Sequence, residues 1–220
     1  GIRCMNWSVL LLHLMGEELI GDADARIVLE SLSEQCENMR LRYIGKYDLS
    51  NWGVLQTTAI CAARLWYPEF VPSEIADWAW ETLQTQLSLQ ILSDGSHWEQ
   101  SPMYHVEVLN TSAKLLTQLQ TAKALGISMD ESACIALGRG EGWKDEHEAM
   151  CGPGEGYEPD QPGWLSDAVR VLSRHVLYTA DPSHYQLPIG DSDVTDVRDV
   201  LTRATVLLPG SGIYRFAAGE

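Results

Sequence analysis

Hydrophobic residues recur at helical spacing along most of the chain. Within residues 103–125 the apolar positions follow one another at steps of three and four, with one step of five. Residues 27–44 and 192–208 show the same periodicity, which places apolar side chains on one face of a helix. We therefore predict helices over residues 4–20, 24–45, 51–67, 73–92, 101–125, 129–137, 162–177 and 192–208.

Start signals support several of these predicted helices. Ser101 followed by Pro102 is typical of an N-cap with proline at the first helical position. The spacing of Ser128 and Glu131 matches a capping box. Strand signals are confined to residues 212–216. The pattern predicts an all-α fold of antiparallel helix pairs, arranged either as a solenoid-like bundle or as a helical toroid.

One internal segment and both ends depart from this pattern. Residues 138–163 are rich in Gly, Pro and Glu, and such a long loop fits either a functional lid or a disordered insertion. The apolar run over residues 8–15 is too short to span a bilayer and has no recognisable signal-peptide context, so we interpret it as a helix entering the core. Both ends of the chain look cut, and we expect a piece of a longer protein.

Composition narrows the classes of partner. The chain has 31 acidic and 15 basic residues and a formal net charge of −16. Without a basic stripe to neutralise phosphates, we expect no nucleic-acid partner. The chain has eight Trp and eight Tyr but only two Phe. The amphipathic rings of Trp and Tyr are suited to packing on the faces of sugars, and equally to contacts between helices. The five Cys are widely spaced and form no CxxC pair, so most are predicted to be buried free thiols.

The stretch SDGSHWEQSPMYHV, residues 93–106, concentrates polar and aromatic groups at a predicted helix start. Asp94-Gly95 is a turn signal, and an N-cap at Ser101 places Tyr104 in the first helical turn. The helix dipole favours negative charge there, so the sequence predicts a stabilised phenolate at Tyr104 that is suited to act as a base. The alternative is a tyrosine that packs its ring and hydrogen-bonds its hydroxyl.

Three segments in this order resemble one enzyme family. DGSHWEQSPMYH resembles the signature of the heparinase II/III-like polysaccharide lyases, in which a tyrosine and the following histidine begin a helix of an incomplete (α/α) toroid. KYDLSNW, residues 46–52, resembles a family element that starts a toroid helix with an Asn, and LPIGDSD, residues 187–193, resembles a Gly-Asp-Ser turn before one of the last helices. The resemblance implies a toroid over residues 1–208 and the beginning of a β-sandwich over 209–220.

The resemblance implies β-elimination on a uronate-containing acidic polysaccharide. Asn51 would hydrogen-bond and so neutralise the uronate carboxylate. Tyr104 would act as base, as acid to the leaving oxygen, or as both. His105 and Glu99 complete the expected catalytic set, with Glu99 orienting a histidine or an arginine. Several relatives supply a further catalytic histidine from the β-sandwich, and many have a histidine where this chain has Trp52.

The remaining expectations concern ligands and partners. Trp52, His97 and Trp98 are the predicted substrate-binding residues. The histidines and Glu99 do not form a zinc-binding motif, and we expect neither a metal nor another cofactor. The expected partners are the acidic polysaccharide and the remainder of the protein's own chain, without a membrane. By resemblance, the protein would be periplasmic or secreted.

Two other functions fit the same residues. A glycoside hydrolase on a similar toroid would pair Glu99 with Asp94 or Asp191 as its two carboxylates. A non-catalytic carbohydrate-binding or scaffold protein would keep the toroid and lack the site, which Trp52 favours. For Asp191 and Asp193, the predicted role is to cap the helix expected over residues 192–208.

Overall fold

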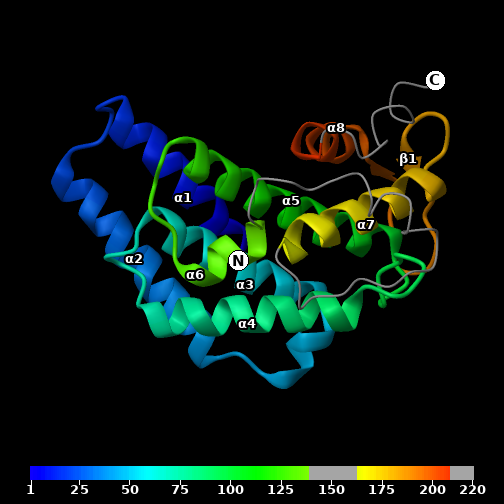
Figure 1. The fold of residues 1–220 in the computed structure, drawn as a ribbon, viewed down its shortest axis with the longest axis horizontal. Coiled ribbons are helices and arrows are strands. Elements are labelled where there is room, and N and C mark those ends of the chain that lie inside the picture. The colour runs from blue at the N-terminus through cyan, green and yellow to red at the C-terminus, as the bar shows by residue number, and fades with distance from the viewer. Residues whose placement is uncertain (139–162, 209–220) are drawn as a thin grey trace.

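The computed structural model describes residues 1–138 and 163–208, and this part of the chain is mostly helical (Figure 1). The predicted all-α class is confirmed, while the toroid and its domain boundaries stay predictions. The elements are α1 (Ile2–Gly16), α2 (Asp22–Leu41), the 3₁₀ helix η1 (Gly45–Leu49), α3 (Asn51–Trp66), α4 (Ser73–Gln90), α5 (Pro102–Ala124), α6 (Glu131–Leu137), α7 (Trp164–Thr179), β1 (Tyr185–Gln186), β2 (Thr195–Asp196) and α8 (Arg198–Leu207).

Helices α3 and α5 form the centre of the described fold. Helix α3 packs against α1, α4 and α5, and α5 in turn packs against α7 and α8. Residues 57–63 of α3 are all buried, and five of these seven are Ala or Thr with little bulk beyond Cβ, so neighbouring helices can approach on several sides. The Thr58 and Thr111 hydroxyls meet at 3.2 Å between the two central helices.

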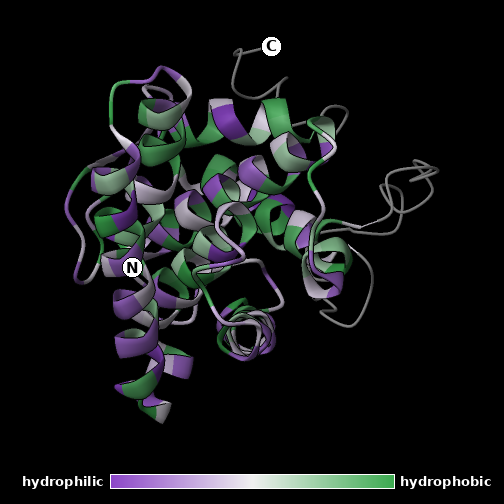
Figure 2. Cartoon of the chain, turned by 90° about the vertical axis from the view of Figure 1, so that its left-hand side faces the viewer, coloured by the Kyte–Doolittle hydropathy of each residue, from purple (hydrophilic) through white to green (hydrophobic). Residues whose placement is uncertain are grey.

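The outer helices are amphipathic. Figure 2 shows hydrophobic and hydrophilic residues side by side on the helices, with α4 seen end-on near the bottom. Such helices bury one face and leave the other in water. No helix in the described ranges is long and apolar enough to cross a membrane. Cys4, Cys36 and Cys61 are buried free thiols as predicted, whereas Cys134 is exposed.

Two predicted helix starts are confirmed and one is wrong. Helix α3 begins at Asn51, and Ser101 caps α5 by accepting a hydrogen bond from the Tyr104 amide at 3.4 Å. The capping box from Ser128 does not form, because α6 begins later, with Asp130 as an N-cap that makes no side-chain cap bond. The Asp130 carboxylate instead accepts two hydrogen bonds from Arg64, at 2.8 and 3.1 Å.

The helix predicted over residues 192–208 also starts later than expected. Within this range Thr195 and Asp196 form the strand β2, which pairs antiparallel with β1, and α8 begins only at Arg198. The Asp196 carboxylate accepts a hydrogen bond from the Arg198 amide at 3.0 Å, so Asp196 is the acid that binds the start of this helix. The loop expected over 138–163, its two end residues apart, and the strand expected over 212–216 lie outside the described residues.

Candidate active site

The loop between α4 and α5 is bound to the start of α3. The Trp98 indole donates to the Leu49 carbonyl at 2.7 Å, and the Trp98 amide donates to the Gln90 carbonyl at 2.8 Å. The Gln90 side-chain amide reaches the carbonyls of Asp48 and Ser50 at 2.8 and 3.3 Å. These bonds bring two predicted site segments together and account for the density of polar groups in the loop.

Glu99 holds Asn51 at the first position of α3. One carboxylate oxygen, Oε2, accepts from the Asn51 backbone amide at 2.9 Å and from its side-chain Nδ2 at 3.0 Å. A carboxylate is favoured at a helix N-terminus, because the amides there carry partial positive charge. Asn51 is itself buried. Glu99 was expected to orient a histidine or an arginine. Its hydrogen bonds go to Asn51, and the same oxygen also lies 3.8 Å from His97 Nδ1.

His97 is buried in a hydrogen-bonded setting. Its Nε2 lies 2.8 Å from Gln90 Oε1, and its Nδ1 lies 3.4 Å from the Glu99 amide. Because that amide can only donate, Nδ1 is the acceptor and Nε2 carries the proton. Burial lowers the pKa of His97 to about 4, opposed by the nearby Glu99 charge. The neutral ring joins the loop to α4 and is not exposed to a substrate.

His105 is likewise enclosed by protein. Its Nδ1 accepts from the His97 amide at 3.2 Å, and its Nε2 lies 3.0 Å from the Leu172 carbonyl on α7. Burial, with the nearby His175 ring stacked at 4.9 Å, lowers the pKa of His105 to about 3. In both imidazoles each ring nitrogen is already hydrogen-bonded within the protein, so neither ring has a nitrogen left for the predicted catalytic role of His105 or the predicted substrate contact of His97. We therefore assign both residues structural roles.

Tyr104 lies in the first turn of α5 and is half-buried. Its hydroxyl donates to Asp191 Oδ2 at 2.6 Å. This hydrogen bond, followed by burial and by the charges of Asp191 and Glu99, raises the pKa of Tyr104. The structure therefore favours the neutral phenol at Tyr104 over the expected phenolate, because its hydroxyl donates to a carboxylate.

Asp191 was expected to cap a helix, and it binds Tyr104 instead. Sequence reasoning missed this pairing because the two residues are 87 positions apart, although the resemblance of the Gly-Asp-Ser turn marked the segment. Asp94, the other acid considered for hydrolysis, accepts from the Ser96 amide at 2.9 Å and hydroxyl at 2.7 Å. Those two bonds lower the pKa of the Asp94 carboxyl.

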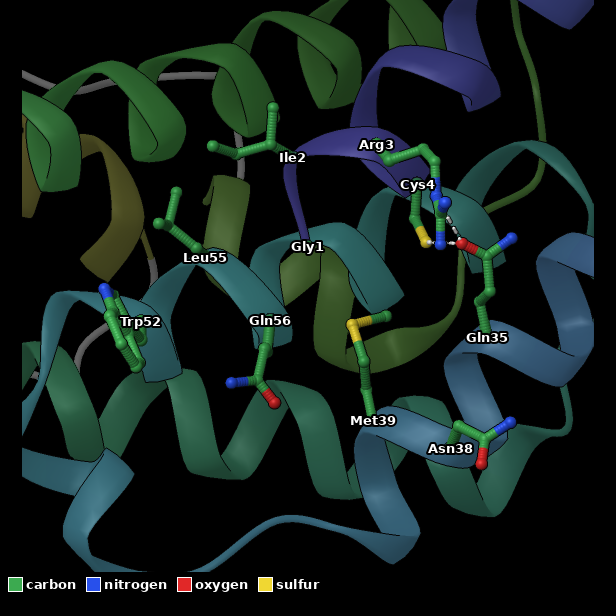
Figure 3. Close-up of a pocket in the computed structure, with 10 residues that line it drawn as sticks. All are labelled: Gly1, Ile2, Arg3, Cys4, Gln35, Asn38, Met39, Trp52, Leu55 and Gln56. Carbon is green, nitrogen blue, oxygen red and sulfur yellow. Dashed lines mark hydrogen bonds between the residues drawn. The ribbon is translucent and has the colours of Figure 1, made fainter.

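An open pocket of about 590 Å³ begins at Trp52, beside Asn51. Figure 3 shows the Trp52 indole at one end of this pocket and the Arg3 guanidinium with Gln35 at the other. The Trp52 side chain is 62% exposed and that of Trp98 is 42% exposed, so both predicted substrate-binding tryptophans present ring surface to solvent. Within the described residues, no group of three or more His, Cys, Asp or Glu side chains could hold a metal ion.

These features define a helical domain in which the starts of α3 and α5 carry a polar cluster built from Asn51, Glu99 and Tyr104. The family model described as Heparinase II/III N-terminus matches residues 20–130, and the chain belongs to this polysaccharide-lyase-like family. The predicted family resemblance is confirmed, and the matched range contains all three residues of the cluster. Comparisons with curated proteins and with solved structures found no significant match.

Proposed function

We propose that this protein cleaves uronate-containing acidic polysaccharides by β-elimination. One observation carries the proposal: Glu99, in the loop that leads into α5, hydrogen-bonds both the backbone amide and the side chain of Asn51. The loop that precedes Tyr104 is therefore bound to Asn51, the other residue that the family resemblance assigns to the reaction, at the starts of two packed helices.

The reaction requires two contributions from the protein. The C5 proton of a uronate lies next to a carboxylate whose negative charge opposes carbanion formation, so that carboxylate needs a hydrogen-bond donor. Asn51 is a neutral amide with two Nδ2 hydrogens, and Glu99 accepts one of them. Tyr104 supplies a phenol for proton transfer, as the C5–H and C4–O bonds break and a C4–C5 double bond forms.

The contacts of the carboxylates favour a lyase over a hydrolase. A glycoside hydrolase needs two carboxyl groups directed at the substrate. In this structure Glu99 is bound to Asn51, Asp191 to Tyr104, and Asp94 to its own turn. All three acids considered for hydrolysis thus already serve other groups.

The pocket at Trp52 supports a polymeric substrate. It carries the exposed indole of Trp52, the residue that follows Asn51 in α3, and is lined by the amides of Gln35, Asn38 and Gln56. Indole faces pack on sugar rings, and amides hydrogen-bond hydroxyls. We propose that sugar units flanking the cleaved bond bind here and against Trp98.

The direct test incubates the full-length protein with a panel of uronate polysaccharides and follows the ultraviolet absorbance of the unsaturated product. Tyr104→Phe is expected to lower kcat by about 10²- to 10⁴-fold, the usual contribution of general acid–base catalysis. Tyr178→Phe, at an exposed tyrosine of α7, is the matched control and is expected to retain activity.

Each other result points to a different function. New reducing ends without ultraviolet absorbance would indicate hydrolysis and refute the lyase proposal. Binding of a polysaccharide without any cleavage would leave a non-catalytic carbohydrate-binding protein. Wild-type activity in Tyr104→Phe would remove Tyr104 from the proposed mechanism.

A further inference from the structure

The turn at residues 190–192 is fixed to the N-terminus of α5. The Ser101 hydroxyl lies 3.0 Å from the Asp191 carbonyl and 2.7 Å from the Ser192 hydroxyl. The Met103 amide donates to the Ser192 hydroxyl at 3.1 Å. One otherwise unpaired amide at the start of α5 is therefore satisfied by a residue far away in the sequence.

The backbone of this turn also depends on a glycine. Gly190 has a φ of +65°, in the left-handed region that a side chain strains. A Cβ at this position would lie 3.7 Å from the Gln100 carbonyl, so the turn passes close to the residue before the α5 N-cap. The turn therefore packs against the start of α5, and the Asp191 carboxylate accepts a hydrogen bond from the Tyr104 hydroxyl at 2.6 Å.

We propose that Asp191 is a positioning residue that holds the Tyr104 hydroxyl in place at the start of α5, from where Tyr104 protonates the leaving oxygen. This inference rests on the lyase function proposed above. Two charged groups act on Tyr104: Asp191 from the turn and Glu99 from the loop before α5. Both are carboxylates, and both favour the neutral phenol over the phenolate.

The proposed elimination involves two separate proton transfers. A base other than Tyr104 takes the C5 proton, and the electron pair of that bond forms the C4–C5 double bond. As the C4–O bond breaks, the Tyr104 proton leaves its hydrogen bond with Asp191 Oδ2 and passes to the leaving oxygen. The resulting phenolate, beside two carboxylates, regains a proton from water, while the base returns its own proton to water. The histidine that the resemblance expects in the β-sandwich is the candidate base.

The first test measures the ionisation of Tyr104 without relying on activity. The ultraviolet difference between the full-length protein and its Tyr104→Phe variant is recorded as the pH rises. The phenol of the wild type is expected to ionise above the ordinary tyrosine value of about 10. In Asp191→Asn the midpoint is expected to fall toward that value, and in Asp191→Glu, which keeps the charge, it is expected to stay high.

The second test follows lyase activity in the same variants. In Asp191→Asn, kcat at neutral pH is expected to fall about 10- to 100-fold with little change in KM, because a neutral amide oxygen holds the phenol more weakly than the carboxylate does. The alkaline limb of the kcat profile is expected to move to lower pH. Asp193→Asn, at an exposed acid of the same loop, is the matched control for both measurements.

The outcomes separate this inference from the proposed function. If Asp191→Asn leaves both the Tyr104 midpoint and the alkaline limb unchanged while Tyr104→Phe is inactive, the role of Asp191 is overturned and the lyase function stands. If the wild type shows no lyase activity, the proposed function fails, and the catalytic role of Asp191 fails with it. The titration would then still report whether the two side chains are coupled.

Discussion

Glu99 and Asn51 are joined by two hydrogen bonds to a single carboxylate oxygen, at 2.9 Å from the backbone amide and 3.0 Å from the side-chain Nδ2. The residues lie 48 positions apart. The loop before α5 thus fixes the orientation of an amide at the start of α3, and the same loop leads into the helix that carries Tyr104. The two helix starts are coupled through this carboxylate.

Removal of this carboxylate is expected to impair catalysis more than folding. In Glu99→Ala the Asn51 amide loses its orienting partner, and kcat is expected to fall about 10- to 100-fold. Stability is expected to decrease by about 1–3 kcal/mol, since a largely buried donor is left unpaired. The checks are product absorbance and denaturant unfolding. Glu99→Gln, which retains an acceptor oxygen, is expected to lose less.

Glu81→Ala is the control for this prediction, because Glu81 lies on the exposed face of α4. It is expected to match the wild type in both measurements. A Glu99→Ala variant with wild-type kcat would show that the orientation of Asn51 does not depend on Glu99.

Acid is expected to destabilise the fold through two buried histidines. The pKa values of His97 and His105 are lowered by burial to about 4 and about 3, from an ordinary value of about 6.5. The folded state therefore resists protonation that the unfolded chain accepts. Above pH 6.5 the two histidines contribute fully to the free energy of unfolding. This contribution is lost progressively as the pH falls below 6.5 toward the pKa values of the folded state.

This dependence is measurable by urea unfolding between pH 4.5 and 7.5. Two extra protons on the unfolded chain correspond to a slope of up to about 3 kcal/mol per pH unit near pH 5. His97→Asn removes one of these two protonation sites, so the slope is expected to fall by the contribution of one proton. His13→Gln, at an exposed histidine of α1, is expected to leave it unchanged. A free energy of unfolding that stays constant from pH 7 to 5 would contradict the prediction.

Gly53 is predicted to be intolerant of a side chain. A Cβ at this position would lie 2.0 Å from the Tyr47 carbonyl oxygen and 2.4 Å from Gln86 Nε2. Backbone cannot yield as a flexible side chain does, so Gly53→Ala is expected to reach the upper end of the usual overpacking cost of about 1–3 kcal/mol. The shift would also disturb η1 and the start of α3, and denaturant unfolding measures the loss.

Gly45 offers a matched comparison within η1. A Cβ there would meet nothing within 4 Å, and Gly45→Ala is expected to change stability by no more than about 0.5 kcal/mol. Equal stability of the Gly53→Ala and Gly45→Ala variants would show that η1 does not pack against α3 as described.

The helical periods of the sequence predict the central helices well, because each buries a continuous apolar face and begins with a local signal. Ser101 and Pro102 are such a signal, and α5 begins where they predict. The start of α8 was misplaced because Ser192 hydrogen-bonds α5 and Thr195 pairs in β2. These tertiary contacts replace the helical bonds that the local pattern favoured.

The sequence by itself determined the all-α class and the positions of Asn51 and Tyr104 at helix starts, since these depend on local spacing and start signals, and the resemblance of three of its segments indicated the family. Only the tertiary structure decided what those residues touch. In the folded chain His97 and His105 are buried, Glu99 accepts hydrogen bonds from Asn51, and Asp191 accepts one from Tyr104. The physical reason is that hydrogen bonds, burial and charge proximity arise between segments far apart in the chain, and for Tyr104 they raise the pKa of a phenol that the helix start alone predicted to be a stabilised phenolate.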